Sequence, residues 1–577
     1  MAVTDQLIFL AGALLTLSIL ATVPADRSGV PVLVVFLGLG MLAGALPMDG
    51  VQLPNLGTAH LLGTTALAVI LFDGGLHTPR SSFRTGFGPG LMLATVGVVV
   101  TTAVAAGLLH AWLGLSWPEA ALLAAMVSST DAAAVFYLLR ARGIELHPRV
   151  RNSLEIESGI NDPLAVFLTL AVIEWMTRDG GAGSGALLWM FVLQLGAGVG
   201  VGFAGGYLLT LAINRCPLST NLYPLQALAG GLVVYGAASL LGGSGFLAAY
   251  LAGLVVGNRA RIARRAIQRF HDGVAWLCQI GLFILLGFLV VPGELLPIAG
   301  SALIVAFILI FIARPVATAV SLLPFGFSWR PMLFMSWVGL RGGVPVVLSL
   351  YPLMAGVDFA RDAFNIIFFV VLVSLTLQGW TVSRVARWLG LLLPREHPDT
   401  SRIDLERPRD HELVVCELPH GSPATRGSMG DLEPPEGVRL VAMVRDDDLR
   451  TPAPELLVHA DDTLYFVVPT HNTTLQERFD HWLDAIGTAH PVQEQAYFGE
   501  FALDAAAPMA DFASVYLTGV PSDVESGESV AMYLQRKLRH RASEGDQLRL
   551  QGVVLVVREM DGGQITTAGV RLPRDTS

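Results

Sequence analysis

Long apolar runs dominate the first 392 residues of the chain. A helix needs about 20 mostly apolar residues to cross the hydrocarbon core of a bilayer, and Pro, Gly or charged residues divide this region into runs near that length. Thirteen membrane spans are predicted, at about 6–23, 30–46, 56–73, 89–113, 118–139, 152–176, 185–213, 222–241, 244–258, 272–291, 296–323, 331–353 and 363–392. The eighth and ninth runs are short and are also compatible with one interrupted element.

After Leu393 the pattern changes to that of a soluble protein. A linker rich in proline and charge is placed at 394–403. Strand-like runs at Leu413–Cys416, Val438–Val444 and Leu464–Val468, and then a helix at about Leu475–Ile486, form a first small domain at 404–486. A second domain at 494–574 has an amphipathic segment at 528–541 and two strands, Gln551–Arg558 and Gln564–Leu572. These strands are joined across Asp561-Gly562-Gly563, and Asp-Gly between alternating runs predicts a hairpin.

Composition and charge support this division. Of 577 residues, 53% are apolar and only 15% are charged, whereas soluble domains carry about 25% charged residues. Residues 1–392 hold 20 arginines against 16 acidic residues, while residues 393–577 hold 17 basic and 31 acidic residues. The sequence therefore predicts an all-α polytopic membrane domain over 1–393, followed by an acidic α+β tail of two small domains.

The arginines between the predicted spans indicate an orientation. Odd-numbered loops hold 14 arginines, and even-numbered loops hold only Arg178 and Arg361. Loops rich in Arg and Lys stay in the cytoplasm. We therefore expect the N-terminus outside and the C-terminal tail inside.

Polar and ionisable side chains fall near the middle of three spans, at depths of about 15–20 Å for a rise of 1.5 Å per residue. Such residues are costly in a membrane and are functional candidates by default. They are Ser128-Ser129-Thr130-Asp131 in the fifth span, Glu155, Glu157, Ser158, Asn161 and Asp162 in the sixth, and Arg341 within Gly339–Pro345 in the twelfth.

Two of these spans are poor continuous helices. Thr130-Asp131 interrupts the fifth span, and Gly342, Gly343 and Pro345 interrupt the twelfth. Interrupted helices at matching positions of two halves indicate a transporter site. Spans 1–6 and 8–13 match in this way if they form inverted repeats about span 7.

Asp162 carries the predicted chemistry. Because desolvation disfavours a charged carboxylate, this group can hold either a proton or a monovalent cation, but not both at once. That competition is sufficient for exchange across a membrane. We expect Thr130, Asp131 and Ser158 to complete an oxygen shell around the cation. Asn161, rather than a second acid, lies beside Asp162, which predicts one cation per proton.

Other charged residues receive supporting roles. Asn161, Glu157 and Arg341 are expected to structure the site, with Arg341 neutralising Glu157. Arg314 in the eleventh span is interpreted as a structural pair or a snorkelling side chain. Asp73 lies at an inner span end, where a solvated position is favoured over a gate.

An enzyme is disfavoured, because no nucleophile–base pair or metal cluster stands out and the three cysteines lack ligand-like spacing. We expect no cofactor and no nucleic-acid partner, only the transported cation, protons and membrane lipid. The rival class is a ligand-gated cation channel. A channel needs rings of carbonyls or acids around a shared axis, and the sequence shows no such filter loop.

The residues around these candidates resemble the monovalent cation:proton antiporter 1 family, in its NhaP branch. The matching segments are Ser128–Phe136, Leu154–Pro163 and Gly339–Gly343, with supporting motifs at Phe72–Gly75 and Ala313–Pro315. The resemblance covers essentially all of residues 1–392. It implies 13 spans, a homodimer, and a core domain that moves against a dimerisation domain.

The resemblance also implies roles for residues. Asp162 is then the carboxylate that binds the cation and the proton, and Arg341 matches the family arginine that pairs with the glutamate of span 6. Implied in or behind the shell are Thr130, Asp131, Ser158, Glu157 and Asn161.

The tail resembles a TrkA-C regulatory domain at about 404–486 and a CorC/HlyC transporter-associated domain at about 494–574. The second likeness rests on Gly545–Leu550 and Val553–Gly563. This combination is similar to bacterial potassium/proton antiporters that regulate cell volume, and it favours K⁺ over Na⁺, which the site residues alone do not. A Na⁺/H⁺ antiporter stays open as an alternative, as does a small-molecule or nucleotide ligand for the tail.

Overall fold

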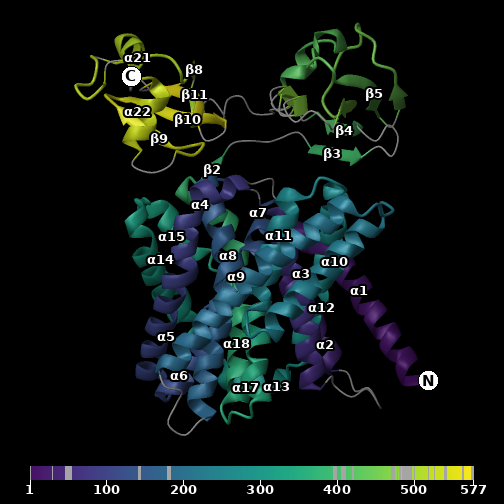
Figure 1. Ribbon diagram of the computed structural model, residues 1–577, viewed down its shortest axis with the longest axis vertical. Coiled ribbons are helices and arrows are strands. Elements are labelled where there is room, and N and C mark those ends of the chain that lie inside the picture. Colours follow the sequence, from purple (N-terminus) through teal and green to yellow (C-terminus); the bar gives the residue numbers. More distant parts are fainter. Residues whose placement is uncertain are drawn as a thin grey trace. The chain divides into compact units, whose positions relative to one another are not determined.

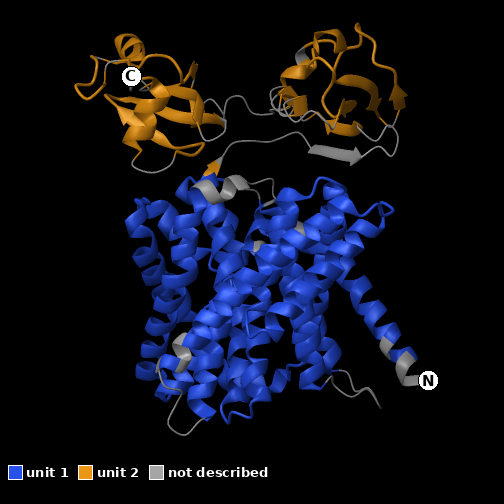
Figure 2. Ribbon diagram, viewed as in Figure 1, with its two compact units in different colours: residues 1–391 blue, residues 392–577 orange. Residues whose placement is uncertain are grey.

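The structure is a computed structural model in which the chain forms two compact units, residues 1–391 and 392–577 (Figure 2). The first unit is a bundle of helices and the second contains two β-sheets (Figure 1). The residues that the structure describes are 2–28, 30–45, 55–78, 80–140, 145–177, 184–393, 399–404, 411–418, 422–446, 448–469, 475–476, 478–479, 482–483, 486, 497–499, 501–517, 519–525, 527–538, 542–561 and 564–572.

Helices account for almost all of the first unit. In chain order its elements are α1 (Ala2–Ser28), α2 (Val32–Ala45), α3 (Leu56–His77), α4 (Arg80–Met92), η1 (Leu93–Gly97), α5 (Val98–Leu113), α6 (Trp117–Met126), α7 (Ala132–Arg140), β1 (Glu145–Leu146), α8 (Pro148–Thr177), α9 (Ser184–Arg215), α10 (Leu222–Leu240), α11 (Gly245–Arg259), α12 (Arg264–Phe288), α13 (Pro292–Phe307), η2 (Ile308–Ala313), α14 (Arg314–Leu322), η3 (Leu323–Phe325), α15 (Trp329–Trp337), α16 (Gly343–Leu348), α17 (Leu350–Met354) and α18 (Ala360–Leu389). Every predicted apolar run overlaps one of these helices or a consecutive series of them.

Eight helical stretches among the described residues are long and apolar enough to cross a membrane, and α2 and Gly343–Met354 are shorter apolar helices. The first unit is therefore that of a multi-pass membrane protein. The eighth and ninth runs form separate helices, α10 and α11, because the chain turns between Leu241 and Ser244.

Local sequence signals place several helix ends. Ser116 begins α6 with a capping box, in which its hydroxyl accepts from the Glu119 N–H and its own N–H donates to the Glu119 carboxylate. Gly114 and Gly390 end α5 and α18 with φ values of 66° and 68°, a left-handed conformation that favours glycine.

Two helical regions contain a π-helical segment. η1 lies between α4 and α5, and η2 lies between α13 and α14, directly before Arg314. These regions correspond to predicted spans 4 and 11. π-Helical turns inside longer helices are often found at functional sites.

Glycines bring α3 and α11 into close backbone contact. A Cβ on Gly75 would lie 2.1 Å from the Tyr250 carbonyl oxygen, and one on Gly253 would lie 2.1 Å from the Phe72 carbonyl oxygen. No larger side chain fits at either position without moving a helix. This contact fixes the relative position of two helices that both line a cavity.

Two helical regions contain a short segment that is not helical. The chain leaves helical conformation after α6 and resumes it at α7, which leaves residues 127–131 outside a helix. It does so again between α15 and α16, at residues 338–342. These ten residues leave backbone N–H and C=O groups free for other contacts.

The second unit begins with β2 (Leu392–Leu393) and contains two antiparallel sheets. The five-stranded sheet has the order β3-β4-β7-β5-β6. Its elements are β3 (Asp399–Asp404), β4 (His411–Glu417), η4 (Pro423–Arg426), η5 (Met429–Asp431), β5 (Arg439–Arg445), β6 (Asp448–Arg450) and β7 (Thr463–Pro469). Alternate residues of β4 and β7 are buried, as expected for strands with one face on a core. The structure describes seven of the twelve residues of the helix predicted over 475–486, and all seven are helical.

The four-stranded sheet has the order β8-β11-β10-β9. Its elements are β8 (Phe501–Asp504), α21 (Met509–Tyr516), α22 (Val530–Lys537), β9 (Gln547–Leu550), β10 (Val553–Asp561) and β11 (Gln564–Arg571). The predicted hairpin is confirmed, since Asp561 pairs with Gln564 and the antiparallel register continues to Val554 and Arg571.

The linker predicted over 394–403 extends too far toward the C-terminus, because a strand begins within it. Asp399–Asp404 form β3, which pairs with β4 from Asp399 opposite Glu417 to Asp404 opposite Glu412. The composition of Asp399–Asp404 is typical of a linker. Backbone hydrogen bonds to the edge of β4 nevertheless make this segment a strand.

Candidate functional site

The two interrupted segments are hydrogen-bonded to each other. The Asp131 N–H donates to the Leu340 carbonyl at 2.8 Å. Arg341 Nη1 donates to the carbonyls of Ser128 and Ser129, at 2.8 and 2.7 Å. Because these carbonyls follow the C-terminal end of α6, a positive charge beside them is also favoured by the helix dipole. Arg341 therefore satisfies backbone groups that the interruption sets free.

A chain of side chains holds Arg341 from the other side. Its backbone N–H donates to Ser374 Oγ at 3.0 Å, and Ser374 donates to Gln378 Oε1 at 2.5 Å. Gln378 Nε2 donates to the Trp337 carbonyl at 2.6 Å, at the end of α15. α18 thus provides polar partners to the interrupted segment between α15 and α16.

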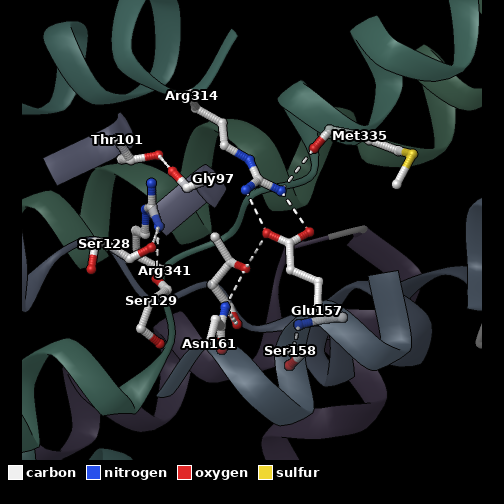
Figure 3. A network of polar contacts seen from close by, with 12 residues as sticks. Gly97, Thr101, Ser128, Ser129, Glu157, Ser158, Asn161, Arg314, Met335 and Arg341 are labelled. Carbon is white, nitrogen blue, oxygen red and sulfur yellow. Dashed lines mark hydrogen bonds and ion pairs between the residues drawn. The ribbon is translucent and has the colours of Figure 1, made fainter. Parts of the chain in front are cut away.

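Glu157 is neutralised by Arg314, which corrects the expectation that Arg341 would be its partner. Arg314 Nη1 and Nη2 lie 2.5 and 2.9 Å from the two Glu157 oxygens, and Nη2 also donates to the Met335 carbonyl (Figure 3). The side chains of Arg314 and Glu157 are 3% and 1% exposed. Arg341 points to Ser128 and Ser129 instead (Figure 3).

Asn161 and Thr130 connect this ion pair to the first interruption. Asn161 Nδ2 donates to Thr130 Oγ1 at 2.8 Å and contacts the Thr130 carbonyl at 3.2 Å. Thr130 Oγ1 in turn donates to Glu157 Oε1 at 3.2 Å. Fixed charge and hydrogen bonds therefore hold Thr130 rigidly beside α8.

Asp162 has different surroundings from Glu157, although both carboxylates are buried and lie on α8. Asp162 is 3% exposed, and its Oδ1 accepts a hydrogen bond from Ser129. Within the described part of the chain no cationic side chain forms an ion pair with it. A buried carboxylate without a cationic partner binds a proton or an external cation readily, because either one removes the cost of its charge.

A cavity of about 410 Å³ reaches Asp162. Its walls include α3, α7, α8, α11, α12 and α16, and among its lining residues are Thr130, Asp131, Ser158 and Asp162. Glu157, Asn161 and Arg341 do not line it. The four residues predicted to bind the ion thus face the cavity, and the three predicted to structure the site lie outside its wall.

Asp131 and Ser158 also cap the start of α7. Asp131 Oδ1 accepts from the Ala134 N–H, and Ser158 Oγ accepts from the Ala132 N–H, both at 3.2 Å. Carboxylate and hydroxyl oxygens at a helix N-terminus satisfy its free N–H groups. The same groups therefore fix α7 and present oxygens to the cavity.

Sequence reasoning missed three features of the site. Ser129 was part of the noted polar segment but was not assigned to Asp162. The structural pair predicted for Arg314 is present, but the sequence did not identify Glu157 as its partner. Ser374 and Gln378 were not singled out, and their i,i+4 spacing on α18 was the available signal.

Comparisons with known proteins agree with this geometry. A protein-family model described as a transmembrane sodium/hydrogen exchanger matches residues 13–388. The chain belongs to this exchanger family. A second model, a transporter associated domain of the CorC/HlyC type, matches residues 494–574, as predicted from the tail.

Similar proteins cover nearly the whole exchanger. A protein of Alkalimonas amylolytica named K(+)/H(+) antiporter NhaP is 39% identical, over 99% of this chain and 99% of its own length. The K(+)/H(+) antiporter NhaP2 of Shewanella oneidensis is also 39% identical, over 98% of each chain. The solved structure of the sodium proton antiporter MjNhaP1 from Methanocaldococcus jannaschii has a TM-score of 0.58 and 22% identity. The match extends over 68% of this chain and over 100% of the MjNhaP1 chain, which shows a shared fold.

The family and the relatives establish the broad activity. The exchanger is a multi-pass membrane protein that exchanges a cation for protons, and it is a transporter rather than an enzyme. In this light the buried polar centre around Asp162 is the candidate site of exchange.

Proposed function

We propose that the chain exchanges cytoplasmic K⁺ for external H⁺ by alternating access, with the two ions competing for Asp162. The observation that carries this proposal is the contrast between two buried acids on one helix. Glu157 is paired with Arg314, whereas Asp162 has a hydroxyl partner and faces a cavity. A cation and a proton can therefore replace each other at Asp162, while Glu157 keeps a fixed partner.

The oxygen atoms around Asp162 are suited to a monovalent cation. Thr130, Asp131 and Ser158 line the same cavity and bring hydroxyl and carboxylate oxygens, the ligand type that hard cations prefer. Asn161, Glu157 and Arg341 hold these residues in place from behind. The transported cation is the substrate of this site, and its arrival releases the proton.

K⁺ is proposed as the cation because similar proteins that cover nearly the whole chain, including those of Alkalimonas amylolytica and Shewanella oneidensis, are named K(+)/H(+) antiporters. The residues of the cavity do not by themselves distinguish K⁺ from Na⁺. A Na⁺/H⁺ antiporter with the same mechanism is the alternative, and the structural neighbour MjNhaP1 is named a sodium proton antiporter.

The architecture proposed for this mechanism has 13 spans, an outside N-terminus and a cytoplasmic tail in the bacterial inner membrane. Two pairs of matching features support inverted repeats about span 7. Spans 5 and 12 are both interrupted, and spans 4 and 11 both contain a π-helical segment. We also propose a homodimer, and a regulatory domain of the TrkA-C type in the part of the tail that contains the five-stranded sheet.

Vesicles with a trapped pH dye test the proposal. KCl, NaCl or choline chloride is added to reconstituted wild type and to Asp162→Asn. We expect cation-dependent proton movement in wild type, strongest with K⁺, and none in the variant. Proton movement that persists in the variant would remove Asp162 from the mechanism. Cation flux without proton counterflow would instead identify a channel.

A further inference from the structure

The cavity that reaches Asp162 also contains a histidine held between two carboxylates. His77 Nδ1 lies 3.4 Å from Asp73 Oδ1, and His77 Nε2 lies 3.4 Å from Asp272 Oδ1. Asp73 and His77 are one turn apart on α3, whereas Asp272 lies on α12. All three line the cavity together with Asp162.

Exposure to solvent places this group at the mouth of the cavity. Asp162 is 3% exposed, whereas the side chains of Asp73, His77 and Asp272 are 17%, 32% and 57% exposed. His77 is the last residue of α3, and Asp162 lies about 20 Å along α8 from Pro148, for a rise of 1.5 Å per residue. A cation that enters from this end therefore passes the histidine before it reaches Asp162.

Both ring nitrogens of His77 face acceptors. Nδ1 also lies 3.1 Å from the Asp73 carbonyl oxygen, so the acceptors are two carboxylates and one carbonyl. A neutral imidazole has a single N–H, and only the protonated ring donates from both nitrogens. Each ring nitrogen lies at ion-pair distance from a carboxylate, and this arrangement favours the protonated ring, because only that form places an N–H toward both sides.

Other ionisable groups surround His77 on each neighbouring helix. On α8 they are Glu155 and Asp162, and on α11 it is Tyr250, whose hydroxyl lies 3.5 Å from Thr78 Oγ1. Asp131 lines the cavity before α7. On α12, His271 Nδ1 donates to the Ile267 carbonyl, and Arg265 and Arg269 carry fixed charges. The side chains of Arg80 and Arg84, which follow His77, lie outside the described part of the chain.

We propose that His77 is a proton-operated switch at the mouth of the cavity. When it is protonated, it bridges Asp73 and Asp272, ties α3 to α12 and cancels part of their negative charge. When it is neutral, this bridge is lost and the negative charge of Asp73 and Asp272 attracts cations toward Asp162. Acid on this side of the membrane therefore lowers the apparent affinity for the cation, in addition to the direct competition at Asp162.

This inference rests on the proposed exchange at Asp162 and is tested by the pH dependence of the apparent KM for K⁺. The full chain is reconstituted in vesicles, and pH is varied on the cavity side. In wild type we expect KM to rise steeply as pH falls. In His77→Gln the rise is shallower, and KM at acid pH lies about three- to ten-fold below wild type, as the loss of one local positive charge implies.

Two further variants separate a switch from a structural role. His77→Lys carries a permanent charge and should show the high, acid-like KM at every pH. Asp272→Asn removes the bridge and one negative charge, so it should raise KM at alkaline pH and flatten the profile. His60→Gln is the matched control, since His60 lies near the other end of α3, and its profile should follow that of wild type.

Identical KM profiles for wild type and His77→Gln would overturn the switch, and so would a low KM in His77→Lys at acid pH. Both results leave exchange at Asp162 intact, because that proposal fails only if Asp162→Asn still couples K⁺ to protons.

Discussion

At the scale of single residues, the site depends on two carboxylates that lie five positions apart on α8 but have different partners. Glu157 is held by a bidentate arginine, and its charge is balanced inside the protein. Asp162 has a serine hydroxyl and an open cavity. Of these two carboxylates, Asp162 is therefore the one with both the access and the unbalanced charge that exchange requires.

The Arg314–Glu157 pair should contribute strongly to stability. Arg314→Gln is expected to lower the free energy of unfolding by about 3–5 kcal/mol, because it leaves a buried charge without its partner. Reversible unfolding of the full chain in mixed micelles measures this change. Arg361→Gln breaks a pair whose side chains are 48% and 44% exposed, and it should cost about 0–1 kcal/mol.

The double variant Glu157→Gln, Arg314→Gln should recover most of the loss, since neither charge is then left alone. If the exposed and the buried pair gave equal losses, Arg314 would not be the partner that balances Glu157.

The sequence predicted which residues are polar at membrane depth, but it could not assign their partners. Asp162, Glu157 and Asn161 follow from their positions in an apolar run. Whether Arg314 or Arg341 reaches Glu157 depends on how α14 and the interrupted segment before α16 are rotated and shifted against α8. That geometry arises from tertiary packing, which no local spacing encodes.

At the scale of elements, the site depends on the crossing of two interrupted helices. Gly342 permits the closest approach, since a Cβ there would lie 2.2 Å from Asp131 Oδ2. Asp131 both caps α7 and lines the cavity. A displacement of the backbone at Gly342 therefore moves Asp131, one of the oxygen-bearing residues that line the cavity with Asp162.

Gly342→Ala should slow exchange by about 100-fold, because misplacing a reacting group by about 1 Å has effects of this size. The proton-flux assay in vesicles measures the rate. Gly300→Ala is the control, since nothing lies within 4 Å of its Cβ position and alanine is favoured in helix α13. An exchange rate in Gly342→Ala near that of the control would show that the crossing tolerates movement.

The elements of the tail show where sequence patterns succeed and fail. Alternating apolar residues correctly predicted β4, β7 and the pair of β10 with β11. β3 was missed because its charged composition resembles a linker, and only its backbone pairing with β4 makes it a strand. Pairing at a sheet edge requires free N–H and C=O groups rather than an apolar pattern.

At the scale of the whole molecule, the chain is a membrane unit of helices and a separate acidic unit of two sheets. Hydropathy and charge were sufficient for that division, because membrane and water select opposite compositions. The cavity could not be predicted, since its walls come from helices that are distant in sequence, from α3 to α16. The group formed by Asp73, His77 and Asp272 could not be predicted either, because it depends on how α3 packs against α12.

The central claim, that a cation and a proton compete for Asp162, is tested most directly by proton release on cation binding. KCl is added to the purified chain in weakly buffered solution, with choline chloride as the control, and a pH dye records released protons. We expect release of about one proton for each bound cation in wild type and none in Asp162→Asn. K⁺ binding without proton release, or equal release from the variant, would contradict the account.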